Sequence, residues 1–196
     1  MSTIVGLVGN HTIWLGADAC LTYDDVVYPC SEKLCQINCN LAIAGAGRPR
    51  TIEIAGMTLK QHLQPSELNL PQWREEFRHA IAEAGQMMEM DAKIQVMQAD
   101  LLIATNKGLF VMLEDFMLYE VQGFTAYGSG KAFALGALAY ADADPDLSGE
   151  RLVNEAIQIA ARFDSHTRPP VTVVKIVRCE ECSPCSPSAP TNGTGA

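Results

Sequence analysis

The opening residues of the chain form two short apolar runs separated by a polar turn, which is the pattern of a β-hairpin. Thr3-Ile4-Val5 and Ile13-Trp14-Leu15 are rich in β-branched and aromatic residues, which favour strands. Gly9-Asn10 between them is a turn signal. The pattern therefore predicts two antiparallel strands at the very start of the chain.

The length of the hairpin loop decides which residue stands opposite Ser2. A three-residue loop, Gly9-Asn10-His11, pairs Ser2 with Asp18, and directly opposed Cβ atoms lie about 5 Å apart. A two-residue loop shifts the register by one and places Ala17 there instead. Both registers are compatible with the sequence.

Short strands and longer helical patterns follow one another in blocks along the rest of the chain. The helical patterns cover residues 51–63, 72–90, 131–143 and 152–163, with a linker over 65–71 and Ser148 as the N-cap of the last helix. Further strands are expected at 26–28, 33–37, 41–44, 100–105, 109–113, 117–121, 125–127 and 171–177. The last strand is apolar at almost every position, which predicts burial on both faces.

The order of these blocks is strands, two helices, strands, two helices and a final strand. Because each sheet has to bury its apolar face, this order predicts an α+β fold in layers. We expect a four-layer αββα sandwich, in which two mainly antiparallel sheets pack together and helices cover both outer faces.

Composition narrows the class of protein. The 196 residues suffice for one domain with a sizeable core, and the net charge of −9 argues against nucleic acid and anionic membranes as partners. No apolar run reaches the roughly 18 residues of a membrane span. The opening strand pattern is unlike a signal peptide, so we expect a cytoplasmic protein.

The seven cysteines are unevenly distributed. Cys20, Cys30, Cys35 and Cys39 fall in the first quarter of the chain, and in a cytoplasmic protein we expect mostly free thiols. Cys179, Cys182 and Cys185 begin a segment that is otherwise polar and proline-bearing. A tetrahedral metal site needs a fourth ligand, which is missing nearby, so we expect residues 179–196 to form a disordered tail after a domain at 1–178.

Ser2 carries the first candidate chemistry. Methionine aminopeptidases remove Met1 when the next residue is small, which would leave a hydroxyl and a free α-amine on one residue. The amine has a pKa near 8 and can accept a hydroxyl proton at neutral pH. Many unrelated chains also begin with Met-Ser, so Ser2 needs support from other positions.

Five segments supply that support. They are Ser2-Thr3-Ile4-Val5, Gly16-Ala17-Asp18, Lys33 with the strand and Ala46-Gly47 turn that follow it, Gly128-Ser129-Gly130 before a helix of small residues, and Asp164 with Thr167 three positions later. In their order and spacing, over residues 2 to about 178, they resemble the proteasome β-type and HslV-like peptidase subunits, which are N-terminal nucleophile hydrolases. That family has the αββα sandwich that the block order predicts.

The resemblance implies a role for each matching residue. Ser2 would be the nucleophile and its α-amine the general base, directly or through a water. Lys33 would lower the pKa of the hydroxyl by its charge, and Asp18 would hold Lys33. Taken one at a time, these residues also have ordinary structural explanations, such as a strand-end cap for Asp18.

The resemblance also implies an oxyanion donor and a supporting group. The N–H of Gly47 would stabilise the oxyanion, with Gly45 as the alternative if the turn is aligned differently. Ser129 and Asp164 would orient the amine and its water.

The function that the resemblance implies is an endopeptidase subunit of a self-compartmentalising ring, which hydrolyses unfolded proteins supplied by an AAA+ ATPase. No cofactor is needed for the chemistry, although backbone carbonyls of Ala161, Asp164 and Thr167 would match a sodium site. A non-catalytic ring subunit and a small-molecule amidase are the alternatives. Three departures separate this chain from the family pattern: Ser instead of Thr at the nucleophile, Arg48-Pro49-Arg50 after Gly47, and the Cys-rich tail.

Overall fold

The computed structural model describes residues 2–23, 26–29, 33–61, 69–87, 98–141 and 148–178. In chain order its elements are β1 (Thr3–Val8), β2 (Thr12–Asp18), β3 (Cys20–Tyr23), β4 (Val26–Pro29), β5 (Leu34–Asn38), β6 (Leu41–Gly47), α1 (Pro49–Lys60), α2 (Leu70–Met87), β7 (Ala99–Thr105), β8 (Leu109–Met112), β9 (Leu118–Val121), β10 (Phe124–Gly128), α3 (Lys131–Ala141), α4 (Gly149–Phe163) and β11 (Val171–Val177). The block order predicted from the sequence is confirmed.

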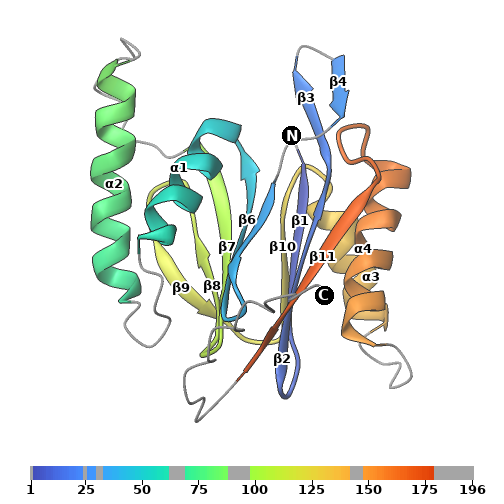
Figure 1. Ribbon diagram of the computed structural model, residues 1–196. Coiled ribbons are helices and arrows are strands. Elements are labelled where there is room, and N and C mark those ends of the chain that lie inside the picture. The colour runs from blue at the N-terminus through green and yellow to red at the C-terminus, as the bar shows by residue number, and fades with distance from the viewer. Residues whose placement is uncertain are drawn as a thin grey trace, which may run out of the picture.

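Two antiparallel sheets form the middle of the molecule. One has four strands in the order β10-β1-β2-β11, and the other has five in the order β5-β6-β7-β8-β9. Helices α1 and α2 lie outside the five-stranded sheet, and α3 and α4 lie outside the four-stranded sheet (Figure 1). The β3–β4 hairpin extends beyond the sheets at the end where β1 begins (Figure 1). The predicted α+β sandwich of four layers is thus the observed architecture.

Each interface between layers has its own apolar core. Trp73 and Phe77 of α2 stack with ring centroids 5.3 Å apart and pack toward the five-stranded sheet. Ile4 and Leu102 belong to the core between the two sheets. Val5 packs with residues of α3 and α4 in the third core. Strand β1 therefore contributes to two cores, through side chains that point to opposite faces.

The turn of the first hairpin lies one residue later than the sequence predicted. The Gly9 N–H donates to the Thr12 carbonyl at 2.7 Å, so Asn10 and His11 form the turn. Gly9 is thus the last hydrogen-bonded residue before the turn and not the first residue of the loop.

The hairpin register differs from both registers considered above. Ile4 pairs with Ala17, so the prediction that Ser2 stands opposite Asp18 is wrong. One step along the ladder, it is Thr3 that faces Asp18, and the Thr3 N–H donates to Asp18 Oδ1 at 2.8 Å. The carboxylate here takes the place of a backbone acceptor at the end of the ladder.

The prediction for the final strand needs a second correction. Val173 and Val174 do contact the cores on the two faces of the sheet, but of the strand's residues only Ile176 is fully buried. The reason is that β11 is an edge strand, paired with β2 on one side. An apolar run alone does not distinguish an edge strand from a central one.

The helix boundaries agree with the sequence to within a few residues. Pro71 lies in the first turn of α2 instead of in a linker, and Asn69 precedes the helix with its side chain accepting from the Gln72 N–H at 3.2 Å. Proline fits there because N–H groups of the first turn have no partner within the helix. Ser148 caps α4 as predicted, by accepting from the Arg151 N–H. Residues 62–63, 88–90 and 142–143, expected as helix ends, lie outside the described residues.

Two predictions about cysteines and membranes fall partly outside the described chain. Cys20 and Cys35 are free thiols, whereas Cys30 and the segment 179–196 lie outside the described residues. Among the helices that the structure describes, none is long and apolar enough to cross a membrane.

Candidate active site

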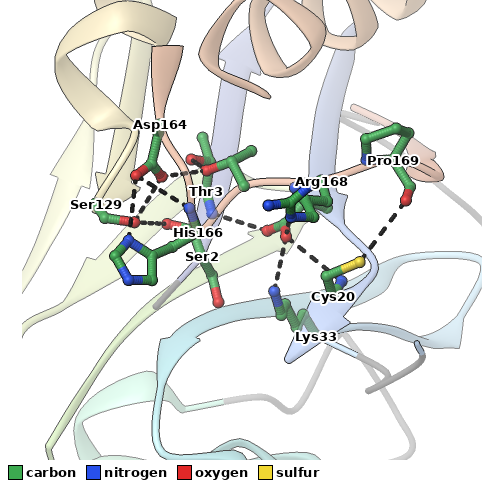
Figure 2. Close-up of polar contacts among 11 residues, drawn as sticks. Ser2, Thr3, Cys20, Lys33, Ser129, Asp164, His166, Arg168 and Pro169 are labelled. Carbon is green, nitrogen blue, oxygen red and sulfur yellow. Dashed lines mark hydrogen bonds and ion pairs between the residues drawn. The ribbon is translucent and has the colours of Figure 1, made fainter. Parts of the chain in front are cut away.

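The alternation of β1 sets the direction of its first side chains. Ile4 belongs to the core between the sheets and Val5 to the core under α3 and α4. Ser2 therefore faces the space between the sheets, and Thr3 faces the helices. Ser2 is 2% exposed and Thr3 is fully buried. In Figure 2, Ser2 lies between the group around Asp164 and the Lys33 ammonium.

A buried ion pair lies on one side of Ser2. Lys33 Nζ is 2.9 Å from Asp18 Oδ2, and the two side chains are 3% and 0% exposed. Burial lowers the pKa of Lys33 from its ordinary value, and the Asp18 carboxylate opposes this by favouring the ammonium form. Lys33 precedes the first residue of β5, and Asp18 ends β2, so both charges lie at strand ends.

Backbone donors hold the Asp18 carboxylate in place. The N–H of Thr3 donates to Oδ1 at 2.8 Å, and the N–H groups of Cys20 and Arg168 lie 3.4 Å from Oδ2. Together with Lys33 they surround the carboxylate with donors. A buried carboxylate keeps its charge only with such partners. Asp18 is thus fixed by three segments that are distant in sequence.

A second polar group lies on the other side of Ser2. Asp164, the residue after α4, accepts from Ser129 Oγ at 2.6 Å and from Thr167 Oγ1 at 2.5 Å. Burial would raise the pKa of Asp164, but these hydrogen bonds outweigh it and hold the pKa below its ordinary value. The Ser129 oxygen also lies 3.5 Å from the Ser2 carbonyl oxygen. Because Ser129 has one hydroxyl proton, the shorter contact with Asp164 takes it.

Strand geometry separates the two candidate oxyanion donors. The Gly45 N–H donates to the Lys33 carbonyl at 2.8 Å and is therefore engaged in the sheet. N–H groups two positions apart on a strand point the same way. The Gly47 N–H therefore also points to the β5 side of β6. It lies past the Leu34–Ala44 pair, where the ladder between β5 and β6 begins. Of the two alternatives, this geometry favours Gly47.

Two glycines allow close backbone contacts, Gly128 with Ser2 and Gly47 with the start of β7. Gly47 has φ +143°, and a Cβ there would lie 2.4 Å from the Gln98 carbonyl oxygen. Gly128 has φ +95°, and a Cβ there would lie 1.9 Å from the Ser2 carbonyl oxygen. Both contacts are too short for any side chain. These positions require glycine for backbone conformation and for space.

The expected sodium ligands lie together at the end of α4. Backbone carbonyls are hard oxygen ligands of the kind that suits such a cation. The Asp164 carbonyl accepts from the Thr167 N–H at 3.2 Å, which leaves one of its two lone pairs. The donor set is chemically compatible with a cation, and sodium binding stays a prediction.

Sequence reasoning named the candidate residues but missed a contact between two hydroxyl groups. The Thr3 and Thr167 hydroxyl oxygens are 2.5 Å apart, both side chains being fully buried. The available signal was the alternation of β1, which turns Thr3 away from Ser2 and toward the helix side. The described structure brings Ser2, Lys33, Ser129 and Asp164 into one region (Figure 2), and Asp18 joins them through its ion pair with Lys33.

Known structures share this architecture. The chain matches the BPH (bacterial proteasome homologue) of Thiobacillus denitrificans with a TM-score of 0.73 and 20% identity, over 91% of this chain and 100% of that one. The same protein in complex with epoxomicin matches with a TM-score of 0.72 and 20% identity, over 90% of this chain and 99% of that one. HslV from Trypanosoma brucei matches with a TM-score of 0.67 and 19% identity, over 89% of this chain and 99% of that one.

These likenesses concern structure, since no protein-family model matches the sequence. They extend over nearly the whole length of each neighbour and nine-tenths of this chain. The chain has the proteasome β-type, HslV-like fold that the resemblance predicted.

Proposed function

We propose that this protein is an N-terminal nucleophile endopeptidase subunit that hydrolyses peptide bonds of unfolded proteins. In the mature chain Met1 is removed and Ser2 carries the free α-amine. The substrate carbonyl binds in front of the Ser2 hydroxyl, between Lys33 and the Gly47 N–H.

The buried Lys33–Asp18 pair beside Ser2 carries this proposal. An ammonium that is 3% exposed is costly to keep in a protein interior. Its position next to a hydroxyl at the start of the chain is explained if its charge favours ionisation of that hydroxyl. A purely structural role would be served as well by apolar residues of similar volume.

The chemistry follows from the positions of these groups. As the Ser2 oxygen bonds to the substrate carbonyl carbon, the α-amine takes the hydroxyl proton. The carbonyl oxygen becomes an oxyanion, which the Gly47 N–H stabilises. The C–N bond then breaks and the leaving nitrogen takes the proton from the amine. Water hydrolyses the acyl ester on Ser2 in the same manner, which restores the hydroxyl.

The Asp164 group acts through the backbone of Ser2. Ser129 lies near the Ser2 carbonyl and is hydrogen-bonded to the ionised Asp164. The negative charge favours a protonated amine during the reaction and holds a water near it. A sodium ion on carbonyls of Ala161, Asp164 and Thr167 would stiffen the turn after α4.

The proposal includes assembly and delivery of substrate. Copies of the chain form a ring in the cytoplasm, the Ser2 sites face an enclosed chamber, and an AAA+ ATPase unfolds substrates and feeds them in. The structural likeness to BPH and HslV supports ring formation.

Hydrolysis of a fluorogenic peptide by Ser2 variants tests the proposal. Ser2→Ala should abolish hydrolysis and leave the assembly intact. Ser2→Thr should keep or raise it, because Thr supplies the same hydroxyl and amine with a stiffer χ1. Intact mass must show the loss of Met1 in each sample. Parental turnover by Ser2→Ala would contradict the assignment.

The same preparation separates the alternatives. A non-catalytic ring subunit would retain Met1 or show no turnover by the parent. A small-molecule amidase would hydrolyse a small amide but leave an unfolded protein such as casein intact. Degradation of casein by the parent and not by Ser2→Ala supports the endopeptidase.

A further inference from the structure

A continuous set of buried hydroxyl contacts connects β1 to the turn after α4. Thr3 Oγ1 lies 2.5 Å from Thr167 Oγ1, and Thr167 Oγ1 donates to Asp164 Oδ2 at 2.5 Å. Asp164 Oδ2 also accepts from Ser129. We refer to Thr3, Thr167 and Asp164 as the hydroxyl relay.

The direction of the relay follows from proton counting. An ionised carboxylate can only accept, so the single proton of the Thr167 hydroxyl points to Asp164. Thr167 Oγ1 then accepts, and Thr3 donates to it. Each hydrogen bond polarises the next in a buried network, so the Thr3 hydroxyl strengthens the bond that Thr167 makes to Asp164.

The backbone of the neighbouring turn is shaped around the relay. A Cβ on Gly130 would lie 2.3 Å from Thr3 Oγ1 and 2.9 Å from Thr167 Oγ1. Both threonine side chains are 0% exposed, so bulk water does not reach their contact. The relay is thus enclosed by the protein at Thr3 and Thr167 and reaches partly exposed surface at Asp164.

Thr3 also connects the two polar groups on either side of Ser2. Its N–H donates to Asp18, the partner of Lys33, while its hydroxyl donates to the group around Asp164. Because Thr3 directly follows Ser2, both bonds restrict the backbone that carries the nucleophile. Figure 2 shows Thr3 between these groups.

We propose that Thr3 is a positioning residue, whose hydroxyl holds the Ser2 backbone and the Asp164 carboxylate in their working arrangement through Thr167. The inference rests on the proposed function and assigns a role to a residue outside the catalytic group. Thr3 touches neither substrate nor the reacting atoms. It acts by fixing where Ser2 and Asp164 lie.

Two substitutions at one position isolate the hydroxyl. Thr3→Val keeps the shape and removes the donor, whereas Thr3→Ser keeps the donor and removes a methyl group. For Thr3→Val we expect kcat on a fluorogenic peptide to fall about tenfold with KM within about twofold, since a hydrogen bond in a charged network contributes about this factor. Thr3→Ser should restore kcat to within about threefold of the parent, because the donor is retained.

A matched control distinguishes positioning from general loss of packing. Thr58 is another buried threonine; its hydroxyl donates to the Ile54 carbonyl and accepts from the Trp73 side chain in the α1–α2 layer. Thr58→Val should lower the thermal unfolding midpoint without changing kcat. In a Thr167→Val background, Thr3→Val should have little further effect, because the acceptor is already absent.

Amide hydrogen exchange at residue 3, whose N–H donates to Asp18, gives a readout that needs no activity. Thr3→Val should lower the protection of this amide below that of the parent, whereas Thr3→Ser and Thr58→Val should not. If the parent with free Ser2 is inactive, the proposed function fails while this exchange measurement still decides the role of Thr3. Unchanged protection of this amide in Thr3→Val overturns the inference, and so does parental kcat in an active preparation. Should Thr3→Val fail to fold, Thr167→Val must show the same loss of protection.

Discussion

Lys33 Nζ lies 2.9 Å from Asp18 Oδ2 in a region where both side chains are almost completely buried. Removing one member of such a pair leaves the other charge without compensation in the interior. We therefore expect Asp18→Ala to lower the free energy of unfolding by about 3–5 kcal/mol. Denaturant unfolding measures this loss.

The double variant Asp18→Asn with Lys33→Met provides the control. It removes both charges, and the Asn oxygen can still accept from the Thr3 N–H. Most of the lost stability should return, although activity should not. If the double variant is as unstable as Asp18→Ala, the penalty arises from packing and not from the unpaired charge.

The activity of Lys33 variants tests its electrostatic role. Lys33→Ala should reduce kcat/KM by about a hundredfold or more, because electrostatic and proton-transfer effects each contribute about that much. Lys60, an exposed lysine at the end of α1, is the matched control, and Lys60→Ala should retain parental activity. Equal activity in both variants would show that the Lys33 charge is not used.

The pH dependence of kcat/KM should have a bell shape. Activity should rise as the Ser2 amine loses its proton near pH 8, and fall as Lys33 loses its own proton. Because burial lowers the pKa of Lys33, the fall should begin below the ordinary 10.5. Asp18→Asn removes the charge that favours the ammonium, so the alkaline limb should move to lower pH. An alkaline limb that stays in place in Asp18→Asn contradicts this assignment.

The shifted pKa values of Lys33 and Asp164 also make the free energy of unfolding depend on pH. Between the lowered pKa of Lys33 and 10.5 the unfolded chain binds more protons, so the Lys33 contribution to stability increases with pH in that window. The pKa of Asp164 is lowered from 3.8, so its contribution is present above that value and is lost as the pH falls through the folded-state pKa.

A pair of glycine substitutions tests the close packing around the relay. Gly130→Ala would place a Cβ 2.3 Å from Thr3 Oγ1, and we expect it to lower both stability and activity. Gly136, on the exposed side of α3, has nothing within 4 Å of the same atom. Gly136→Ala should raise the free energy of unfolding by about 0.5–1 kcal/mol, because Ala is the better helix former. Similar effects from the two substitutions would contradict the packing argument.

The layers could be predicted from the sequence because apolar periodicity repeats in every element. The periodicity within each strand and helix indicates which face it buries, and the order of the blocks indicates how the layers are stacked. The register of the first hairpin could not be obtained in this way. Whether Gly9 belongs to the strand or to the turn changes the partner of Asp18 from Ser2 to Thr3, and apolar residues fit both registers.

The candidate site depended on contacts that no local pattern contains. Lys33 and Asp18 meet because β2 and β5 belong to different sheets that pack face to face, and the resemblance alone placed them together. The choice between Gly45 and Gly47 needed the Gly45–Lys33 backbone hydrogen bond. Thr3 was absent from the predicted site because its hydroxyl faces the helix side, where its partner lies 164 positions away in sequence.

The outer face of α3 and the end of α4 expose apolar side chains that favour self-association. After Lys131, α3 has no charged residue up to Ala141, and its Tyr140 side chain is 88% exposed. Nearby on the same layer, Phe133 and Phe163 stack with ring centroids 5.4 Å apart and are 40% and 67% exposed. Exposed apolar side chains gathered on one face are typical of protein interfaces.

Light scattering should therefore give a particle many times the 21.2 kDa of the chain. Tyr140→Glu introduces a charge that must be desolvated if this face packs against another copy, so the variant should form a smaller particle. Met57→Glu is the matched control: Met57 is 58% exposed on α1, in the opposite outer layer, and this variant should keep the parental mass. Full-sized particles from Tyr140→Glu would place the contact elsewhere. A monomeric parent at micromolar concentration would contradict the ring, because the proposed chamber needs several copies to enclose it.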